Sequence, residues 1–274
     1  MSRTIPRPIA LVLACSMAVA AAGPDGSTDL RATQVTIAIE RGGARRQFRA
    51  TVVGRQDDIL TVLTAAHCLS DSDRDGPAVL VLGGEELEGT VLSVARNPSY
   101  RDAPNREIPG SDHPIAWSGR TRAGPAAPPA GPSPGGRTNG EVPGPDSAVA
   151  RFRFRAGNRP VDEAFRAIRV APALTARSYP GPAGQTVSVR MVDQKGEEHA
   201  LRAGNYSNPR WLEWGPSYKP IPGDSGGGVF VLHAGADGKP RPILIGIIVR
   251  RDDRGGSASL ISLDQRWLAD ALPR

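Results

Sequence analysis

A serine in a glycine-dense turn and a distant histidine are the residues of this sequence best suited to chemistry. Ser225 stands in Pro222–Gly228, a segment with four glycines, and the apolar run Val229–Leu232 follows it. Glycine permits positive φ angles and close approach of other chain segments, so such a turn can expose a hydroxyl and direct its own N–H groups at one point. That geometry suits attack on a carbonyl and stabilisation of the resulting oxyanion, provided that a base activates the serine. His67 is the candidate base.

A third candidate, Asp146, stands at the entrance of a segment with strand periodicity. In Ala148–Phe154 alanines and phenylalanines alternate with arginines, which predicts a half-buried strand. His67 follows another predicted strand, Ile59–Leu63, through the small residues of Thr64–Cys68, which favour a tight helical turn. Each of the three residues is common in purely structural roles. Their occurrence together in one strand-rich chain favours a proton relay.

The rest of the chain predicts short strands between Gly and Pro turns. With 32 glycines and 26 prolines, the composition favours an all-β fold over helical bundles. The other predicted strands are Gln34–Ile39, Gln47–Val53, Val79–Leu82, Leu87–Val94, Thr186–Val192, Ala200–Ala203, Trp211–Trp214, Val229–Leu232, Ile243–Val249 and Ser259–Ser262. At the end of the chain, the capping-box pattern of Ser262–Gln265 precedes apolar residues at helical spacing. This predicts one terminal helix that packs Trp267 onto the β core.

Three local motifs resemble those of the chymotrypsin-like (trypsin-fold) serine proteases, and the chain resembles a divergent, bacterial-type member. Thr64–Cys68 is similar to that family's histidine box, Gly223–Gly227 to its serine box, and Asp146–Val149 to its aspartate box, with Ser147 off the pattern. The order of the three residues is also the family's. The resemblance covers most of the chain after about residue 34. It implies an all-β fold of two antiparallel Greek-key β-barrels with a C-terminal α-helix, and a site in the cleft between the barrels.

The same resemblance implies a role for each residue in an exported serine endopeptidase that acts on a protein or peptide substrate. Ser225 would attack the scissile carbonyl, and His67 would take its proton and return it to the leaving amine. Asp146 would hold the imidazole, and the N–H groups of Gly223 and Ser225 would form the oxyanion hole. Asp112 is a rival for the aspartate role, but it lacks the strand that follows Asp146.

The sequence also departs from the family pattern. Val52 stands where the usual disulfide partner of Cys68 is expected, and no family-type mature terminus is visible, so Asp224 needs a partner other than a terminal ammonium. Lys219 occupies the position of the floor of the first substrate pocket, and Arg251 ends the segment that resembles the pocket wall. We take both as candidate substrate-binding residues, and this predicts that the enzyme does not cleave after Lys or Arg.

The N-terminus predicts export. A basic start with Arg3 and Arg7, a short apolar run and Ala20–Gly23 have the form of a secretory signal, and the run is too short to span a bilayer stably. An alternative is lipid attachment at Cys15. The predicted organisation is a signal peptide at 1–22 and a protease domain at 34–274, made of an N-terminal barrel at 34–116, a Pro/Gly-rich insertion or linker at 117–145, and a C-terminal barrel with the helix at 146–274.

The remaining features of the sequence predict neither a cofactor nor a metal. Asp71–Gly76 has the opening pattern of a calcium loop, but Leu82 replaces the bidentate glutamate, so we interpret the segment as a solvated acidic turn. Cys68, without an intramolecular partner once the leader is removed, predicts a small buried thiol. The net charge of +6 comes from scattered arginines, which argues against nucleic-acid binding. The sequence indicates no oligomeric state.

Two other functions are compatible with these motifs. A non-catalytic binding module on the same fold would explain the altered pocket and the absent disulfides. An esterase could use the same three residues, although the serine box lacks the G-x-S-x-G form. Covalent labelling of Ser225 by a fluorophosphonate separates the enzymes from the binding module.

Overall fold

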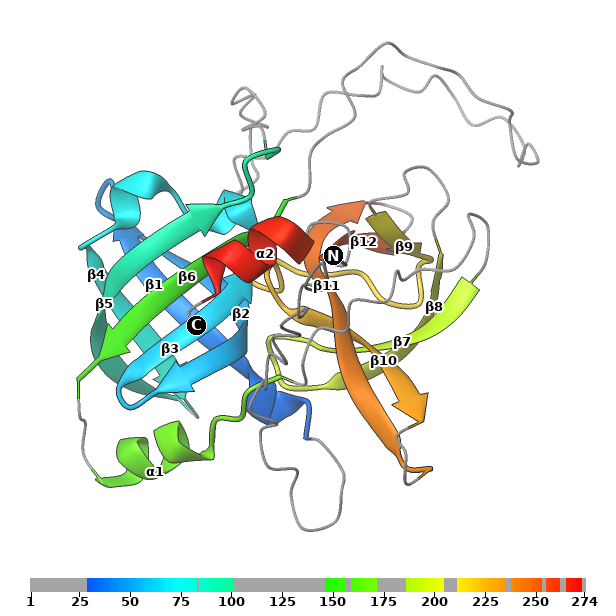
Figure 1. The fold of residues 1–274 in the computed structure, drawn as a ribbon, viewed down its shortest axis with the longest axis horizontal. Coiled ribbons are helices and arrows are strands. Elements are labelled where there is room, and N and C mark those ends of the chain that lie inside the picture. Colours follow the sequence, from blue (N-terminus) through cyan, green and yellow to red (C-terminus); the bar gives the residue numbers. More distant parts are fainter. Residues whose placement is uncertain are drawn as a thin grey trace, which may run out of the picture.

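The computed structural model describes residues 29–82, 84–100, 146–155, 159–171, 186–204, 211–234, 238–252, 255–261 and 265–272. Their strands form two closed barrels, which lie side by side in Figure 1. The resemblance predicted this all-β architecture of two antiparallel barrels, and the structure confirms it. The signal peptide, the rival Asp112 and the Pro/Gly-rich segment lie outside the described residues.

The first barrel has the strand order β1-β2-β3-β6-β5-β4, and all of its pairs are antiparallel. Its strands are β1 (Gln34–Arg41), β2 (Ala44–Gln56), β3 (Ile59–Thr64), β4 (Pro77–Leu82), β5 (Glu85–Arg96) and β6 (Ala148–Phe154). The alternation in β6 has the predicted sense: Phe152 and Phe154 are buried in the core, and Arg153 is exposed. Three short 3-10 helices, η1 (Arg31–Thr33), η2 (Ala66–Cys68) and η3 (Asp71–Asp73), flank these strands.

The position of β6 corrects the predicted division of the domain. We assigned 146–274 to the C-terminal barrel, whereas β6 pairs with β3 and β5 inside the first barrel. The Gly- and Pro-rich composition of 117–145 suggested a boundary between barrels, but this segment connects two strands of the same barrel. Strand β6 belongs there because it closes the first barrel. It hydrogen-bonds β3 on one side and β5 on the other, and without β6 both of these strands would have unpaired edges.

The second barrel repeats the same strand order with six later strands. It runs β7-β8-β9-β12-β11-β10, with β7 (Thr186–Val192) pairing back to β10 (Gly228–Ala234). The other strands are β8 (Glu198–Gly204), β9 (Trp211–Trp214), β11 (Pro240–Asp252) and β12 (Gly255–Leu260). The two barrels are therefore topologically equivalent halves, as expected of a Greek-key pair.

A shared apolar cluster joins the two barrels. It includes Leu63 and Val149 from the first barrel and Phe230 and Ile247 from the second. Helix α2 (Gln265–Ala271) packs the half-buried Trp267 against this cluster. It is the red helix in Figure 1, and it confirms the predicted terminal helix. Its predicted capping residues lie outside the described part of the chain.

One helix is absent from the sequence prediction. Helix α1 (Arg159–Ala167) follows β6 and packs Phe165 into the core of the first barrel. The guanidinium of Arg55 lies 4.7 Å from the Phe165 ring centroid and donates to the carbonyls of Phe165 and Arg166 at 3.0 and 3.2 Å. This end of the helix is stabilised by a residue about 110 positions away, as a cation at a helix C-terminus does.

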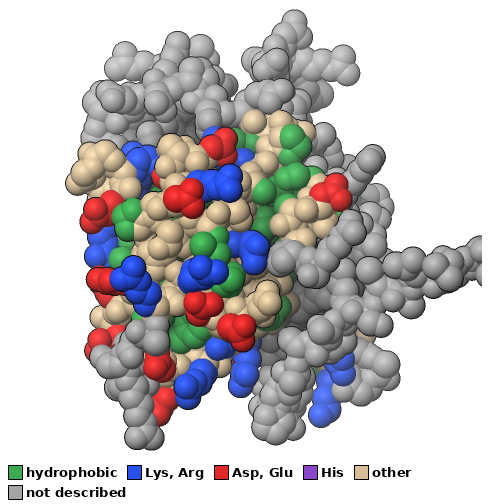
Figure 2. Space-filling model, turned by 60° about the vertical axis from the view of Figure 1, so that its left-hand side comes forward, with side chains coloured by type: hydrophobic (Ala, Val, Ile, Leu, Met, Phe, Trp, Pro, Cys, Tyr) green, Lys and Arg blue, Asp and Glu red, His purple; other side chains and the backbone are tan. Residues whose placement is uncertain are grey.

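The outer face of the first barrel carries both signs of charge. Figure 2 shows Lys and Arg side chains interspersed with Asp and Glu over this face, without a stripe of one sign. Arg45 and Glu86, for example, form an exposed ion pair at 2.6 Å. This face therefore lacks the one-sided basic surface that nucleic-acid binding uses. None of the described helices is long and apolar enough to cross a membrane.

Candidate active site

The antiparallel pairing of β3 and β6 brings His67 and Asp146 together. Thr64, the last residue of β3, lies opposite Ala148, the first residue of β6. His67 follows Thr64 by three residues in η2, and Asp146 precedes Ala148 by two, so both stand at the same end of the strand pair. Strand register, rather than proximity in sequence, creates this contact.

Asp146 holds His67 by two hydrogen bonds. The Nδ1–H group of His67 donates to Oδ2 of Asp146 at 2.7 Å, and the backbone N–H of His67 donates to Oδ1 at 3.0 Å. The second bond fixes the carboxylate relative to the main chain that carries the ring. Because an ionised carboxylate only accepts, the pair places the imidazole proton on Nδ1 and leaves Nε2 as the basic nitrogen.

The pair is largely enclosed, which strengthens its electrostatics. The side chains are 10% and 15% exposed for His67 and Asp146 respectively. Burial is the largest single influence on the pKa of His67 and would lower it, but the Asp146 carboxylate and the neighbouring Cys68 together raise the pKa of the imidazole well above its ordinary value. The site thus favours an imidazolium next to Asp146, which is the species that forms when His67 accepts a proton.

Ser225 lies in a turn between β9 and β10, and the turn is docked on the first barrel. The carbonyl of Ser225 accepts a hydrogen bond from the backbone N–H of Arg49 in β2 at 3.0 Å. Gly226 packs directly against the carbonyl of Arg49 and the hydroxyl of Thr64, where a Cβ atom would collide with both. The serine turn therefore contacts the last residue of β3, from which His67 follows.

A second inter-barrel hydrogen bond continues this contact. The backbone N–H of Gly228 donates to Oε1 of Gln34 at 2.9 Å, and the amide of Gln34 also bonds the hydroxyl of Thr51. Gln34 is buried and lies in β1. It was not identified as a site residue from the sequence, because nothing local distinguishes it from any other glutamine at a strand end.

The backbone before Ser225 has the form of a type II turn. Asp224 N–H donates to the carbonyl of Ile221 at 3.0 Å, Pro222 is the second residue of the turn, and Gly223 has a φ of +99°. Among the described residues, the N–H groups of Gly223 and Ser225 and the hydroxyl of Ser225 have no hydrogen-bond partner. These are the three groups that the sequence predicts to act on the substrate.

Asp224, between these two residues, is completely buried and its carboxylate is fully engaged. Oδ1 accepts from the backbone N–H of Gln194 at 2.9 Å, and Oδ2 accepts from the hydroxyl of Tyr218 at 2.6 Å and the backbone N–H of Ile221 at 2.7 Å. The sequence predicts a partner of Asp224 other than a terminal ammonium, but it does not indicate which residue that is. Tyr218 lies six residues from Asp224, and no motif marks it.

The proposed substrate-binding residues lie on two separate segments. Lys219 is exposed in the loop between β9 and the serine turn. Arg251 lies near the end of β11, opposite Gly256 of β12, and its side chain is outside the described part of the chain. No described contact joins the two residues.

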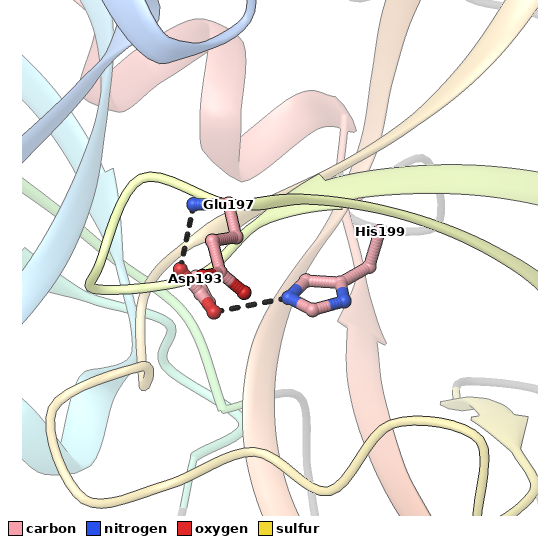
Figure 3. A group of neighbouring side chains, drawn as sticks. All are labelled: Asp193, Glu197 and His199. Carbon is pink, nitrogen blue, oxygen red and sulfur yellow. Dashed lines mark hydrogen bonds and ion pairs between the residues drawn. The ribbon is translucent and has the colours of Figure 1, made fainter.

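Asp193, Glu197 and His199 form a cluster at the hairpin between β7 and β8 (Figure 3). Each offers one potential metal-ligand atom, and these atoms lie within 4.8 Å of one another. The Asp193 carboxylate already accepts from the backbone N–H groups of Lys195 and Glu197 at 2.9 and 2.8 Å and from Nε2 of His199 at 3.0 Å. Burial acts to raise the pKa of Asp193, but these hydrogen bonds outweigh it and lower the pKa. Within this cluster the Asp193 carboxylate is therefore already engaged by the protein's own donors.

The acidic turn at residues 71–76 is less solvated than the sequence suggested. Asp73 is buried, pairs with Arg41, and accepts from the backbone N–H of Ser70 at 2.7 Å as part of a capping box. Asp71 and Asp75 are exposed. One carboxylate of the calcium-like pattern therefore has a structural role. Cys68 is a free, half-buried thiol that packs between the apolar clusters.

Comparisons with known proteins found distant structural likenesses only. No protein-family model matches the sequence, and no curated protein sequence matches it significantly. Three similar solved structures are a kallikrein-related peptidase 10 complex with Zn2+ (12% identity, 90% of this chain and 98% of that chain, TM-score 0.47), the scabies mite inactivated protease paralogue S-I1 (12%, 89% and 96%, 0.49) and the protease Anisep from Arthrobacter nicotinovorans (13%, 88% and 95%, 0.47). All are trypsin- or chymotrypsin-fold proteins.

Proposed function

We propose that the chain is an exported serine endopeptidase that hydrolyses peptide bonds through His67, Asp146 and Ser225. The observation that carries the proposal is the His67–Asp146 pair, with the serine turn docked on the strand that leads to His67. Acyl transfer requires a serine hydroxyl, a histidine held by a carboxylate and N–H groups for the oxyanion, and the residue types for all three parts occur on these docked segments.

In the proposed mechanism, Ser225 Oγ attacks the carbonyl carbon of the scissile peptide while Nε2 of His67 takes the hydroxyl proton. The carbonyl oxygen becomes an oxyanion and accepts hydrogen bonds from the N–H groups of Gly223 and Ser225. The C–N bond then breaks, and His67 returns the proton to the leaving amine. Water attacks the acyl ester by the same path in reverse and frees Ser225. Asp146 stays ionised and stabilises the imidazolium in both halves.

The proposed cleavage preference rests on Lys219 and Arg251. We propose Lys219 and Arg251 as substrate-binding residues, and cations in the substrate pocket would repel Lys and Arg side chains. A peptide-library profile should therefore lack Lys and Arg at the cleaved position. Enrichment of either residue there would contradict the assignment of Lys219 and Arg251, while leaving the proposed chemistry intact.

Export is proposed from the basic and apolar pattern of residues 1–22. Mass spectrometry of the secreted or periplasmic chain should find cleavage before Gly23. A retained, lipid-modified Cys15 would instead support anchoring.

The decisive test of the chemistry is covalent labelling by a fluorophosphonate. We expect the full chain to incorporate one label at Ser225, and Ser225→Ala to abolish it. His67→Ala should reduce the labelling rate by several orders of magnitude, since the hydroxyl loses its base. A folded chain that binds peptides but neither labels nor cleaves them would be a binding module.

A further inference from the structure

The oxyanion-binding conformation depends on a carboxylate that lies deep in the protein. Asp224 is 0% exposed and separates Gly223 from Ser225, the two residues whose N–H groups would bind the oxyanion. A buried charge is costly unless hydrogen bonds and nearby opposite charge compensate it. Whatever binds the Asp224 carboxylate therefore also fixes the direction of both flanking peptide groups.

Residues close to Asp224 in the fold supply these hydrogen bonds. Two of the three come from backbone N–H groups, those of Gln194 and Ile221, and cannot be removed by exchanging a side chain. The third comes from the hydroxyl of Tyr218 and is the shortest, at 2.6 Å. Bonds from neutral donors to an ionised carboxylate are among the stronger ones in proteins. Tyr218 is thus the only side-chain donor to Asp224 among the described residues.

Tyr218 is itself held from three sides. Its backbone carbonyl accepts a hydrogen bond from Nε1 of Trp214 at 3.0 Å. Its ring stacks on the imidazole of His199, with centroids 4.2 Å apart, and His199 is fixed by its hydrogen bond to Asp193. Burial, and then the bond to Asp224, raise the pKa of Tyr218 above its ordinary value, so the hydroxyl keeps its proton and remains a donor.

A buried arginine of the first barrel, Arg49, interacts electrostatically with Asp224. Arg49 is 6% exposed, and no hydrogen-bond partner of its Nε atom occurs among the described residues. Burial lowers the pKa of this guanidinium, while the charges of Asp224 and Asp193 partly offset that effect. The same residue holds the Ser225 carbonyl through its backbone N–H.

We propose that Tyr218 is a positioning residue that builds the oxyanion hole. Its hydroxyl, with the N–H groups of Gln194 and Ile221, anchors Asp224 and so holds Gly223 and Ser225 in their substrate-binding conformation. The anchor consists of residues of the folded second barrel, so the turn does not depend on the insertion of a freed chain terminus. The expected effect of Tyr218 on kcat rests on the proposed function. Its effect on the conformation of the turn does not.

The test compares Tyr218→Phe with the wild-type full chain. This variant keeps the ring that stacks on His199 and removes only the hydroxyl. We expect kcat to fall about tenfold to a hundredfold, the range for losing one hydrogen bond to a charged group, with KM changed by less than about threefold. The rate of fluorophosphonate labelling should fall by a similar factor. Hydrogen exchange of a peptide covering 221–228 should become faster, because the turn loses one of its three fixed bonds.

Asp73→Asn is the matched control. It also disturbs a buried, hydrogen-bonded carboxylate, but in the first barrel and outside the site. A merely structural role for Tyr218 predicts that both variants lose thermal stability and keep wild-type kcat. Wild-type kcat and exchange in Tyr218→Phe would overturn the inference. If the wild-type chain neither labels nor cleaves, the proposed function fails, and the exchange of 221–228 alone decides the inference: faster exchange supports it and unchanged exchange refutes it.

Discussion

The substitution Asp146→Asn tests the candidate site most directly, because the two bonds of Asp146 make conflicting demands on an amide. The carboxylate accepts from both the backbone N–H and the Nδ1–H of His67. An asparagine offers one oxygen and one NH2 group. If its oxygen keeps the backbone N–H, the NH2 group faces Nδ1, which must then become an acceptor. The ring proton moves to Nε2, and His67 can no longer take the proton of Ser225.

The expected loss follows from that tautomer. A wrong tautomer with intact geometry costs a factor on the order of 10⁴ in kcat, which corresponds to about 5.5 kcal/mol of transition-state stabilisation. If the amide rotates so that its oxygen faces Nδ1, the tautomer is correct, but the charge is lost and the His67 N–H faces a donor. Either orientation predicts a severe loss of kcat with little change in KM, since the hydrogen bonds of Asp146 go to His67 and its proposed role is to position that base.

The pH dependence of kcat/KM provides a second test of Asp146, because the direction of its shift can be predicted. In the wild-type chain the carboxylate raises the pKa of His67, so kcat/KM should rise as the pH passes through that raised value and the base becomes neutral. In a variant without this carboxylate, burial is the dominant influence on His67 and lowers the pKa of its imidazole. The ascending limb of the residual activity of Asp146→Asn should therefore move to lower pH.

Steady-state kinetics of the full chain from pH 5 to 10 provide both readouts. Asp73→Asn and Asp112→Asn are the controls, and both should retain wild-type kcat. A loss of less than about tenfold in Asp146→Asn, or a large loss in Asp112→Asn, would refute the assignment of Asp146. An ascending limb that moves to higher pH would show that the carboxylate does not stabilise the imidazolium.

Three further outcomes are expected. Gly226→Ala should reduce kcat/KM by at least about a hundredfold without unfolding the chain, because the φ of +88° and the packing against Arg49 leave no room for a Cβ atom; near-normal kinetics would contradict the docked turn. Phe152→Ala, in the core of the first barrel, should lower the free energy of unfolding by about 3–5 kcal/mol in a urea titration, and a change below about 1 kcal/mol would argue against its burial. Calorimetric titration with Ca²⁺ should show no micromolar site at residues 71–76, since Asp73 is paired with Arg41; micromolar binding that Asp71→Ala abolishes would overturn that interpretation.

Local sequence patterns are sufficient to locate the strands, but they are not sufficient to assign each strand to a barrel. The alternation of Phe152 and Phe154 with arginines identifies β6 and the side that it buries, because a strand presents alternate residues to opposite faces. Which barrel takes β6 depends on the pairing of Thr64 with Ala148, a contact across 84 residues of sequence that no local pattern encodes. The Gly- and Pro-rich segment between them misled the prediction, because composition indicates poor burial and not topology.

The same limit applies to helix α1 and to the anchor of Asp224. The segment 159–167 has a helical apolar face, but its end is stabilised by Arg55 from β2. Gln194 reaches Asp224 from the hairpin between β7 and β8, a contact between distant parts of the chain, whereas Tyr218 reaches it within the connection between β9 and β10, where no motif marks the tyrosine. Sequence patterns could identify the residues of the candidate triad, whose types and local motifs are distinctive. They could not identify the residues that position them, whose types are ordinary and whose role arises from packing.

The arrangement of the site across both barrels explains why these supporting residues matter. His67 and Asp146 are fixed within the first barrel by the register of β3 and β6, while Ser225 belongs to the second. Within the described residues, the relative position of the two parts depends on the shared apolar cluster and on a few directional contacts, such as those from Arg49 to Ser225 and from Gly228 to Gln34. Apolar contacts tolerate small shifts, whereas a misplacement of 1 Å can cost about a hundredfold in rate. The directional contacts therefore set the geometry of the proposed triad, and the apolar cluster supplies the stability that allows them to do so without disulfides among the described residues.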